Sequence, residues 1–191
     1  MVAIGETGTT VTSRADQAFA GQRAQFIEAM SQIVSGVSIV TTDGHAGRFG
    51  LTVSSFCSLD ADPPMVLICV NQRSPLLQAI IQNRVLALNV LAESHAELAD
   101  VFAGRPNHGA AYDFGRASWT AGETRSPLLE GAVALFDCDL SEHYEAATHV
   151  IFTAKVRRSQ HDPQIPLLYT RRAYGRPGPL LAESAPREDM E

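Results

Sequence analysis

The sequence lacks the short motifs that mark several common catalytic and binding sites. Its 191 residues contain no H-E-x-x-H and no G-x-S-x-G pattern, and no G-x-G-x-x-G follows a predicted strand. The six histidines do not cluster with cysteine. These absences argue against a zinc peptidase, a hydrolase with a serine nucleophile and a dinucleotide site of the Rossmann type.

The sequence is also poor in positive charge and in long apolar runs. Its 15 Lys and Arg against 21 Asp and Glu give a net charge of -6. Binding nucleic acid needs clustered cations, so no nucleic-acid partner is expected. The apolar run Met65–Val70 has the length of a strand, whereas a membrane span needs roughly 20 residues, so no membrane segment is expected. The N-terminus has no basic segment before a long apolar one, which predicts no secretory signal and a cytoplasmic location.

Cysteine is scarce and shows no metal-binding spacing. Cys57, Cys69 and Cys138 are odd in number, far apart and form no C-x-x-C pair. The last two lie in apolar, strand-like runs. We therefore expect buried free thiols.

What the chain does contain is the composition of a folded globular protein. Hydrophobic residues make up 45% and charged residues 19% of the sequence. A chain of this length can build one well-buried core. The start is rich in Thr, Gly and Ala without periodicity, and the end is charged and contains proline. We therefore predict one domain over residues 21–181 between mobile tails at 1–20 and 182–191.

Apolar spacing, capping residues and turn residues predict the elements of this domain. The expected helices are Phe26–Val34 ended by Gly36, Pro75–Gln82 with Ser74 as N-cap, and a third from a Ser94/Glu97 capping box to Gly104. The expected strands are residues 37–42, 49–55, 65–70, 85–90, 133–140, 150–158 and 165–169.

The strands decide the fold class. The first two form a hairpin around Asp43-Gly44, and the third is apolar throughout, which suits burial on both faces. Many strands with hairpin connections and only two or three short helices predict a mainly β fold. We expect an antiparallel closed or split β-barrel with a few peripheral helices rather than a doubly wound sheet.

The second predicted strand has two different faces. Apolar Phe49, Leu51 and Val53 alternate with Gly50, Thr52 and Ser54, and further serines follow. The small face suits a flat aromatic ligand, whose polar rim or phosphate would bind hydroxyl and backbone N–H groups. The alternative is a half-exposed strand with its hydroxyls in water.

A second polar group lies where the third strand ends and a helix begins. Asn71, Arg73 and Ser74 occupy this corner. A helix N-terminus favours anions, so the corner suits a phosphate. The alternative is that Ser-Pro only marks the start of the helix.

His143 and His149, with Glu142 and Glu145, are the candidate metal ligands, because imidazole and carboxylate groups bind metals well. The segment fits a polar loop between strands better, and no metal is expected.

Several segments together resemble a known family. They are VSIVTT, GLTVSSFCSLDADPPMVLICVNQRSP, VLALNVLAE with FAG after it, CDLSEHYEAATHVIF and PLLYTRRAYG. In order and spacing they are similar to the short-chain flavin reductases with the FMN-binding split-barrel fold, from about Phe26 to Gly175. The resemblance implies a homodimer that uses NADH or NADPH to reduce FMN or FAD. It also implies that the reduced flavin passes to a separate monooxygenase.

The resemblance also implies which residues bind the cofactors. The family's flavin contacts fall on Thr52, Val53, Ser54 and Ser55, on Asn71 and Ser74 at the phosphate, and on the corner Phe102, Ala103 and Gly104. The nicotinamide site of the family uses the histidine of a Gly-Asp-His motif, which is His149 here, preceded by Ala147-Thr148. Tyr169 resembles an aromatic residue near the nicotinamide, and its alternative is a core tyrosine.

The implied reaction moves a hydride from nicotinamide C4 to flavin N5. The cofactors supply this chemistry while the protein binds and aligns them, so no catalytic side chain is expected to be indispensable. Two alternatives stay open. One is a flavin carrier or sensor without reductase activity, and the other is a single-component oxidase or oxygenase that retains its flavin.

Overall fold

The main element is a seven-stranded antiparallel sheet. The structure, a computed structural model, describes residues 14–179, with side chains from Phe19 onward. In spatial order the strands are β3 (Phe49–Val53), β2 (Ser38–Thr42), β6 (Val85–Val90), β9 (Ala134–Ala146), β10 (His149–His161), β5 (Pro64–Asn71) and β4 (Phe56–Ala61). The predicted mainly β fold and the predicted β2–β3 hairpin are confirmed.

The sheet curls so that its two edges meet at one point. β3 and β4 are the outermost strands, yet only Ser54 and Ser55 separate them in sequence. Two residues span at most about 10 Å between the flanking Cα atoms, so the ends of these edge strands lie close together. They do not pair with each other. This arrangement is a split barrel, and the serines lie at the split.

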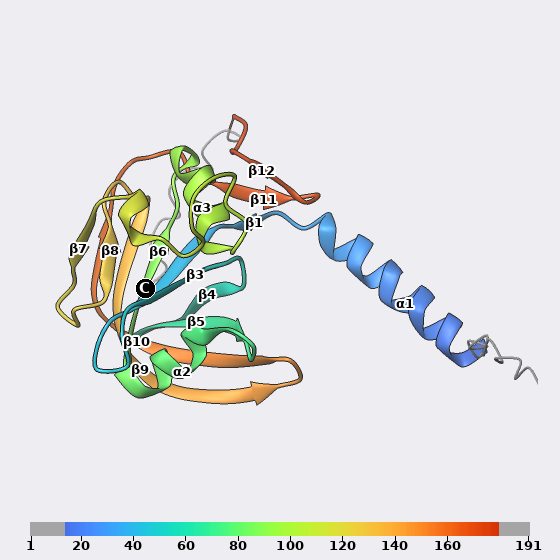
Figure 1. The fold of residues 1–191 in the computed structure, drawn as a ribbon, viewed down its shortest axis with the longest axis horizontal. Coiled ribbons are helices and arrows are strands. Elements are labelled where there is room, and N and C mark those ends of the chain that lie inside the picture. The colour runs from blue at the N-terminus through green and yellow to red at the C-terminus, as the bar shows by residue number, and fades with distance from the viewer. Residues whose placement is uncertain (1–13, 180–191) are drawn as a thin grey trace, which may run out of the picture.

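Two small sheets and three helices complete the described fold (Figure 1). One 3-10 turn, Glu93–His95, leads into a helix, and another, Phe114–Arg116, precedes the second small sheet. The first small sheet contains β1 (Ser35–Gly36), β11 (Leu168–Thr170) and β12 (Ala173–Gly175), and the second contains β7 (Trp119–Ala121) and β8 (Pro127–Leu129). The helices are α1 (Arg14–Ser31), α2 (Pro75–Asn83) and α3 (Ala96–Phe102).

Two apolar clusters lie on opposite sides of β2. Val40 belongs to the cluster inside the curled sheet, where α2 closes one end with Leu76 and Ile80. The adjacent residue Ile39 has its side chain on the other face of β2 and belongs to a second cluster under α3, which includes Phe102. β2 is buried along its whole length because both of its faces pack against a core.

The start of α2 follows the prediction, whereas the start of α3 does not. The Ser74 side chain accepts a hydrogen bond from the Leu76 N–H at 3.3 Å, as an N-cap does. The Ser94/Glu97 capping box is wrong, because a 3-10 turn over Glu93–His95 precedes α3 and places Ser94 inside it. His95 Nδ1 instead accepts the Ala92 N–H at 3.2 Å.

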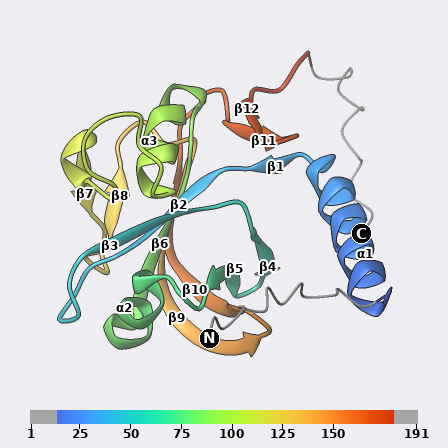
Figure 2. The ribbon, with the colours of Figure 1, turned by 45° about the vertical axis from the view of Figure 1, so that its right-hand side comes forward.

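Helix α1 extends away from the sheets (Figures 1 and 2). It ends at Ser31 rather than at Gly36, and residues 14–20 of the predicted first tail lie in it. Residues 1–13 and 182–191 of the predicted tails lie outside the described residues. The predicted apolar stripe is exposed, with Phe26 at 65% and Met30 at 48%. No part of the described chain covers it.

Burial of β5 and of the cysteines differs from the prediction. In β5 only one face is buried, because no described element covers the other, where Cys69 is half-buried. Cys57 is exposed on the edge strand β4, so the expected burial is wrong for this thiol and confirmed only for Cys138. Burial, followed by nearby Asp137 and Asp139, raises the pKa of Cys138 to about 12. This thiol stays protonated at neutral pH.

Among residues 14–179, no helix combines the length and the apolar character that crossing a membrane requires.

Candidate functional site

A cleft opens where β3 ends, beside α3 and the β11–β12 hairpin. Its volume is about 160 Å³, and Val37, Thr52, Val53, Ser54, Ala103, Arg105, Tyr169 and Tyr174 line it. Thr52, Val53, Ser54, Ala103 and Tyr169 come from the sequence prediction. The fold thus brings three distant segments of the predicted site together.

The floor of the cleft is fixed by contacts between β3 and α3. Phe102 is fully buried beneath β3, and a Cβ added at Gly50 would lie 2.6 Å from its ring. Phe102 also packs edge-on against Phe114, with ring centroids 5.0 Å apart. The Thr52 hydroxyl donates to the Ala99 carbonyl at 2.7 Å. Phe102 and the Thr52 hydroxyl therefore shape the cleft from below, and neither is free to contact a ligand.

The exposed hydroxyls of the site belong to Ser54 and Ser55. Both residues are exposed, and their side chains form no hydrogen bond within the described part of the chain. The Ser55 carbonyl accepts the Cys69 N–H at 2.9 Å, which holds the serines beside β5. These two hydroxyls are available to a ligand at the split of the barrel.

The corner after α3 forms one wall. The helix ends at Phe102, and Gly104 has a φ of 75°, a conformation that glycine adopts without strain. A Cβ at Gly104 would lie 2.5 Å from the Tyr112 hydroxyl, so glycine also lets Tyr112 approach. Ala103 lines the cleft, while Gly104 supports the wall.

A hydrogen-bonded pair joins this wall to the opposite one. The Tyr174 hydroxyl donates to Asp100 Oδ1 at 3.1 Å, and the Tyr174 ring lies 5.5 Å from the Tyr169 ring. Arg105 lies 3.8 Å from the same carboxylate. Burial, followed by the hydrogen bond to Asp100, raises the pKa of Tyr174 to about 12. Tyr174 therefore stays protonated at neutral pH and positions the hairpin.

The other predicted residues meet at a second corner, at the end of β5. His149 is directly opposite Asn71 in the β5–β10 pairing, and the Gln72 N–H donates to the Thr148 carbonyl at 2.9 Å. The Ser74 N–H donates to the Asn71 carbonyl at 2.9 Å. Asn71 lies two residues beyond Cys69 in β5, which is about 7 Å along the strand from the point where Ser55 is held. The corner and the cleft are therefore neighbours joined by the serines.

Comparison with known proteins agrees with this geometry. The family model of the flavin reductase like domain matches residues 30–178. The chain belongs to this flavin reductase family. An FMN reductase (NADH) RutF 2 of Methylorubrum extorquens is 40% identical over 148 residues, which are 77% of this chain and 85% of the relative.

Two solved structures carry the same fold as this flavin reductase domain. The NADH:FAD oxidoreductase SgcE6 of Streptomyces globisporus is 28% identical and matches with a TM-score of 0.74 over 90% of this chain and 99% of its own. BorF, the flavin reductase component of a bacterial two-component tryptophan halogenase, is 26% identical and has a TM-score of 0.72. The match covers 81% of this chain and 97% of BorF.

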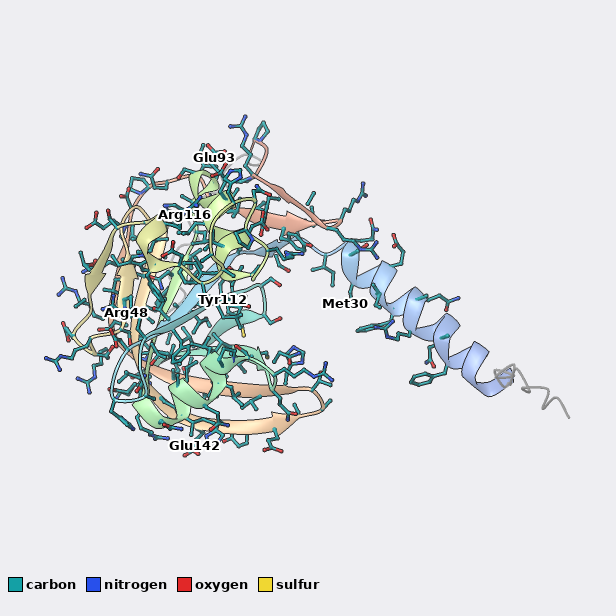
Figure 3. The ribbon with its side chains drawn as sticks, viewed as in Figure 1. Met30, Arg48, Glu93, Tyr112, Arg116 and Glu142 are labelled. Carbon is teal, nitrogen blue, oxygen red and sulfur yellow. The ribbon has the colours of Figure 1, made fainter. Side chains whose placement is uncertain are left out.

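The prediction that the segment from Glu142 to His149 forms a polar loop between strands is wrong. Glu142, His143 and Glu145 lie in β9, and His149 begins β10 after a two-residue turn. Glu142 points outward from this hairpin (Figure 3). His143 pairs with Phe152, three positions from His149, so about 10 Å of strand separates the two histidines. Residues 14–179 hold no group of three potential metal ligands.

Sequence reasoning missed three residues that line the cleft, namely Val37, Arg105 and Tyr174. Tyr174 lies in the PLLYTRRAYG segment, and Arg105 directly follows Gly104. Their positions next to segments already singled out were the available signal. Their pairing with Asp100 joins residues up to 74 positions apart, and no local pattern contains it.

Proposed function

We propose that this chain is an NADH-dependent flavin reductase that binds FMN or FAD reversibly and supplies reduced flavin to a partner monooxygenase. One observation carries the proposal most: the end of β3, Ala103 and Tyr169 surround a single cleft in a chain of the flavin reductase family. RutF 2 is named an NADH-dependent FMN reductase, and SgcE6 an NADH:FAD oxidoreductase. BorF is the flavin reductase component of a two-component tryptophan halogenase, which supports a partner enzyme for this chain.

The residues fit a flavin placed with its ring at the split of the barrel. The backbone from Thr52 to Ser55 would flank the ring, Ala103 would cover it, and the free serine hydroxyls would bind its polar rim. Asn71 and Ser74 at the N-terminus of α2 would hold the phosphate. Phe102 and Gly104 would act by shaping the wall.

The nicotinamide would approach from the side of Tyr169 and His149. Tyr169 lines the cleft, and its half-buried ring offers a flat face. The exposed His149 ring would fix the nucleotide by hydrogen bonding. A bound flavin would supply the hydride acceptor, and these residues would align the two rings and limit water between them.

We infer that two copies of the chain associate. An apolar cavity of about 340 Å³ lies at the open side of the barrel between Phe56, Met65 and Val156, and the apolar stripe of α1 is also exposed. A second copy would remove both surfaces from water. Light scattering after gel filtration should give twice the chain mass of 20.6 kDa, and a monomer mass would contradict the inference.

The cytoplasm is the location that we propose. No disulfide joins the three cysteines, and the exposed Cys57 thiol suits a reducing compartment.

The test of the function is NADH oxidation by the purified protein under air, with FMN or FAD added in excess over the protein. Rapid oxidation that depends on added flavin supports the proposal and ranks the two flavins. Flavin binding without NADH oxidation would instead indicate a carrier or sensor. A flavin that stays bound through gel filtration, with no stimulation by added flavin, would indicate a single-component oxidase or oxygenase.

A further inference from the structure

A groove leads from the cleft toward the turn between β11 and β12. A cavity of about 280 Å³ adjoins the cleft, because Ser54 and Tyr169 line both spaces. Its other walls come from Met30 in the last turn of α1, from Ile33 just after the helix, and from the turn itself. Figure 3 shows Met30 at the end of α1 that joins the body. A ligand longer than one ring system can therefore continue out of the cleft along this path.

Two arginines form the turn at the far end of the groove. Thr170 pairs with Ala173, which leaves Arg171 and Arg172 as a two-residue loop with φ values of 47° and 61°. Positive φ at both positions is the geometry of a type I′ turn, for which Asn-Gly is the favoured pair. Arginine at both positions costs backbone strain. The two arginines therefore occupy this turn although its backbone geometry favours Asn-Gly.

The position of the turn is fixed by α1. The Arg171 N–H donates to the Ser31 carbonyl at 2.7 Å, and Arg171 Nε donates to Gln32 Oε1 at 3.0 Å. The Thr170 hydroxyl also donates to the Ser31 carbonyl, at 3.4 Å. These bonds hold the turn in place, and they leave the Arg172 side chain without a hydrogen bond within residues 19–179.

The groove has an excess of positive charge. Within the described side chains, neither Arg171 nor Arg172 forms an ion pair. Arg105, at the cleft end, contacts Asp100 only at 3.8 Å. Glu28 is the acidic residue of the neighbouring hollow that both arginines line, and it lies outside the groove itself. In a chain of net charge -6, this local excess of cations favours an anionic ligand.

We propose that Arg172, with Arg171 beside it, binds the diphosphate of NADH, whose nicotinamide would enter the cleft from the side of Tyr169. The inference rests on the proposed function and adds a site to it. NADH carries a diphosphate, and a guanidinium group binds phosphate oxygens through two parallel hydrogen bonds.

The test replaces Arg172 by glycine and compares it with a matched control. Arg125 also has a positive φ, 73°, in the hairpin between β7 and β8, and it does not line the groove. Arg172→Gly and Arg125→Gly both relieve a strained turn, so both proteins should fold. Arg172→Gly should raise the KM for NADH about tenfold. Arg125→Gly should change this KM less than about twofold.

Mononucleotides identify the group that is bound. With FMN as acceptor and reduced nicotinamide mononucleotide as donor, Arg172→Gly should leave both KM values within about twofold. A rise in the KM for NADH that is absent with reduced nicotinamide mononucleotide assigns the groove to the nicotinamide dinucleotide and supports the inference. An unchanged KM for NADH, a rise confined to FAD, or an equal rise with the mononucleotides would overturn it. If the unsubstituted protein fails to oxidise NADH, the proposed function itself is wrong.

Discussion

The floor of the cleft and its rim are built differently. In the floor, Phe102 is fully buried and the Thr52 hydroxyl is bonded to backbone. On the rim and at the neighbouring corner, Ser54 and His149 respectively are exposed and lie in or beside turns. The comparison shows that core packing sets the shape of the cleft, whereas side chains that the core leaves free supply contacts to ligands. Substitutions in the floor should therefore reduce stability, and substitutions on the rim should reduce binding alone.

The largest effect is expected for Phe102→Ala. Emptying this fully buried site under β3 should lower the free energy of unfolding by about 3–5 kcal/mol, because the surrounding aromatic rings can refill the cavity only partly. Urea unfolding measures it. Tyr144→Ala, at a position 57% exposed on the β9–β10 hairpin, is the control and should stay within about 0.5 kcal/mol. Equal losses of unfolding free energy in both variants would contradict the idea that packing of Phe102 stabilises the floor of the cleft.

Thr52→Val should have an intermediate effect. Loss of the hydrogen bond to the Ala99 carbonyl should cost about 1 kcal/mol of unfolding free energy. The flavin Kd should change less than about threefold, because the hydroxyl faces α3. Thr52→Ser, which keeps the hydroxyl, should recover most of the stability. A large loss of flavin affinity at full stability would instead move the Thr52 hydroxyl to the ligand side.

The smallest effect on stability is expected for His149→Ala. The unfolding free energy should change by less than about 0.5 kcal/mol, since the ring is exposed. NADH-driven flavin reduction should slow about tenfold or more, with flavin affinity largely kept, because the nicotinamide ring loses its alignment. His161→Ala, on an exposed residue at the other end of β10, is the control. Steady-state kinetics that match the unsubstituted protein would remove His149 from the site.

Local sequence signals predicted the elements whose ends depend on local chemistry. The strand Val85–Val90 and the Ser74 cap of α2 are where the pattern put them. β4 and β7 were missed, because they are exposed or short and carry no clear alternation. The Ser94 cap failed because His95 bonds the Ala92 N–H and shifts the turn. The exposure of the apolar stripe of α1 could not be predicted either, since apolar spacing predicts a helix but does not say what covers its apolar face.

The site also has a part that the sequence predicted and a part that depends on contacts across the fold. The family resemblance singled out Thr52–Ser54, Ala103 and Tyr169, and the fold gathers them around one cleft. It could not show that Phe102 supports the wall from beneath. That depends on burial, and the pairing of Tyr174 with Asp100 depends on contacts across the fold.

The most direct test of flavin reduction is an anaerobic single-turnover measurement. The protein is mixed with oxidised FMN and NADH without oxygen, and the flavin absorbance is followed before the mixture passes through a membrane that retains protein. We expect rapid bleaching of the flavin and reduced FMN in the filtrate. Flavin that binds but stays oxidised would contradict the reductase, and reduced flavin retained with the protein would contradict its release to a partner enzyme.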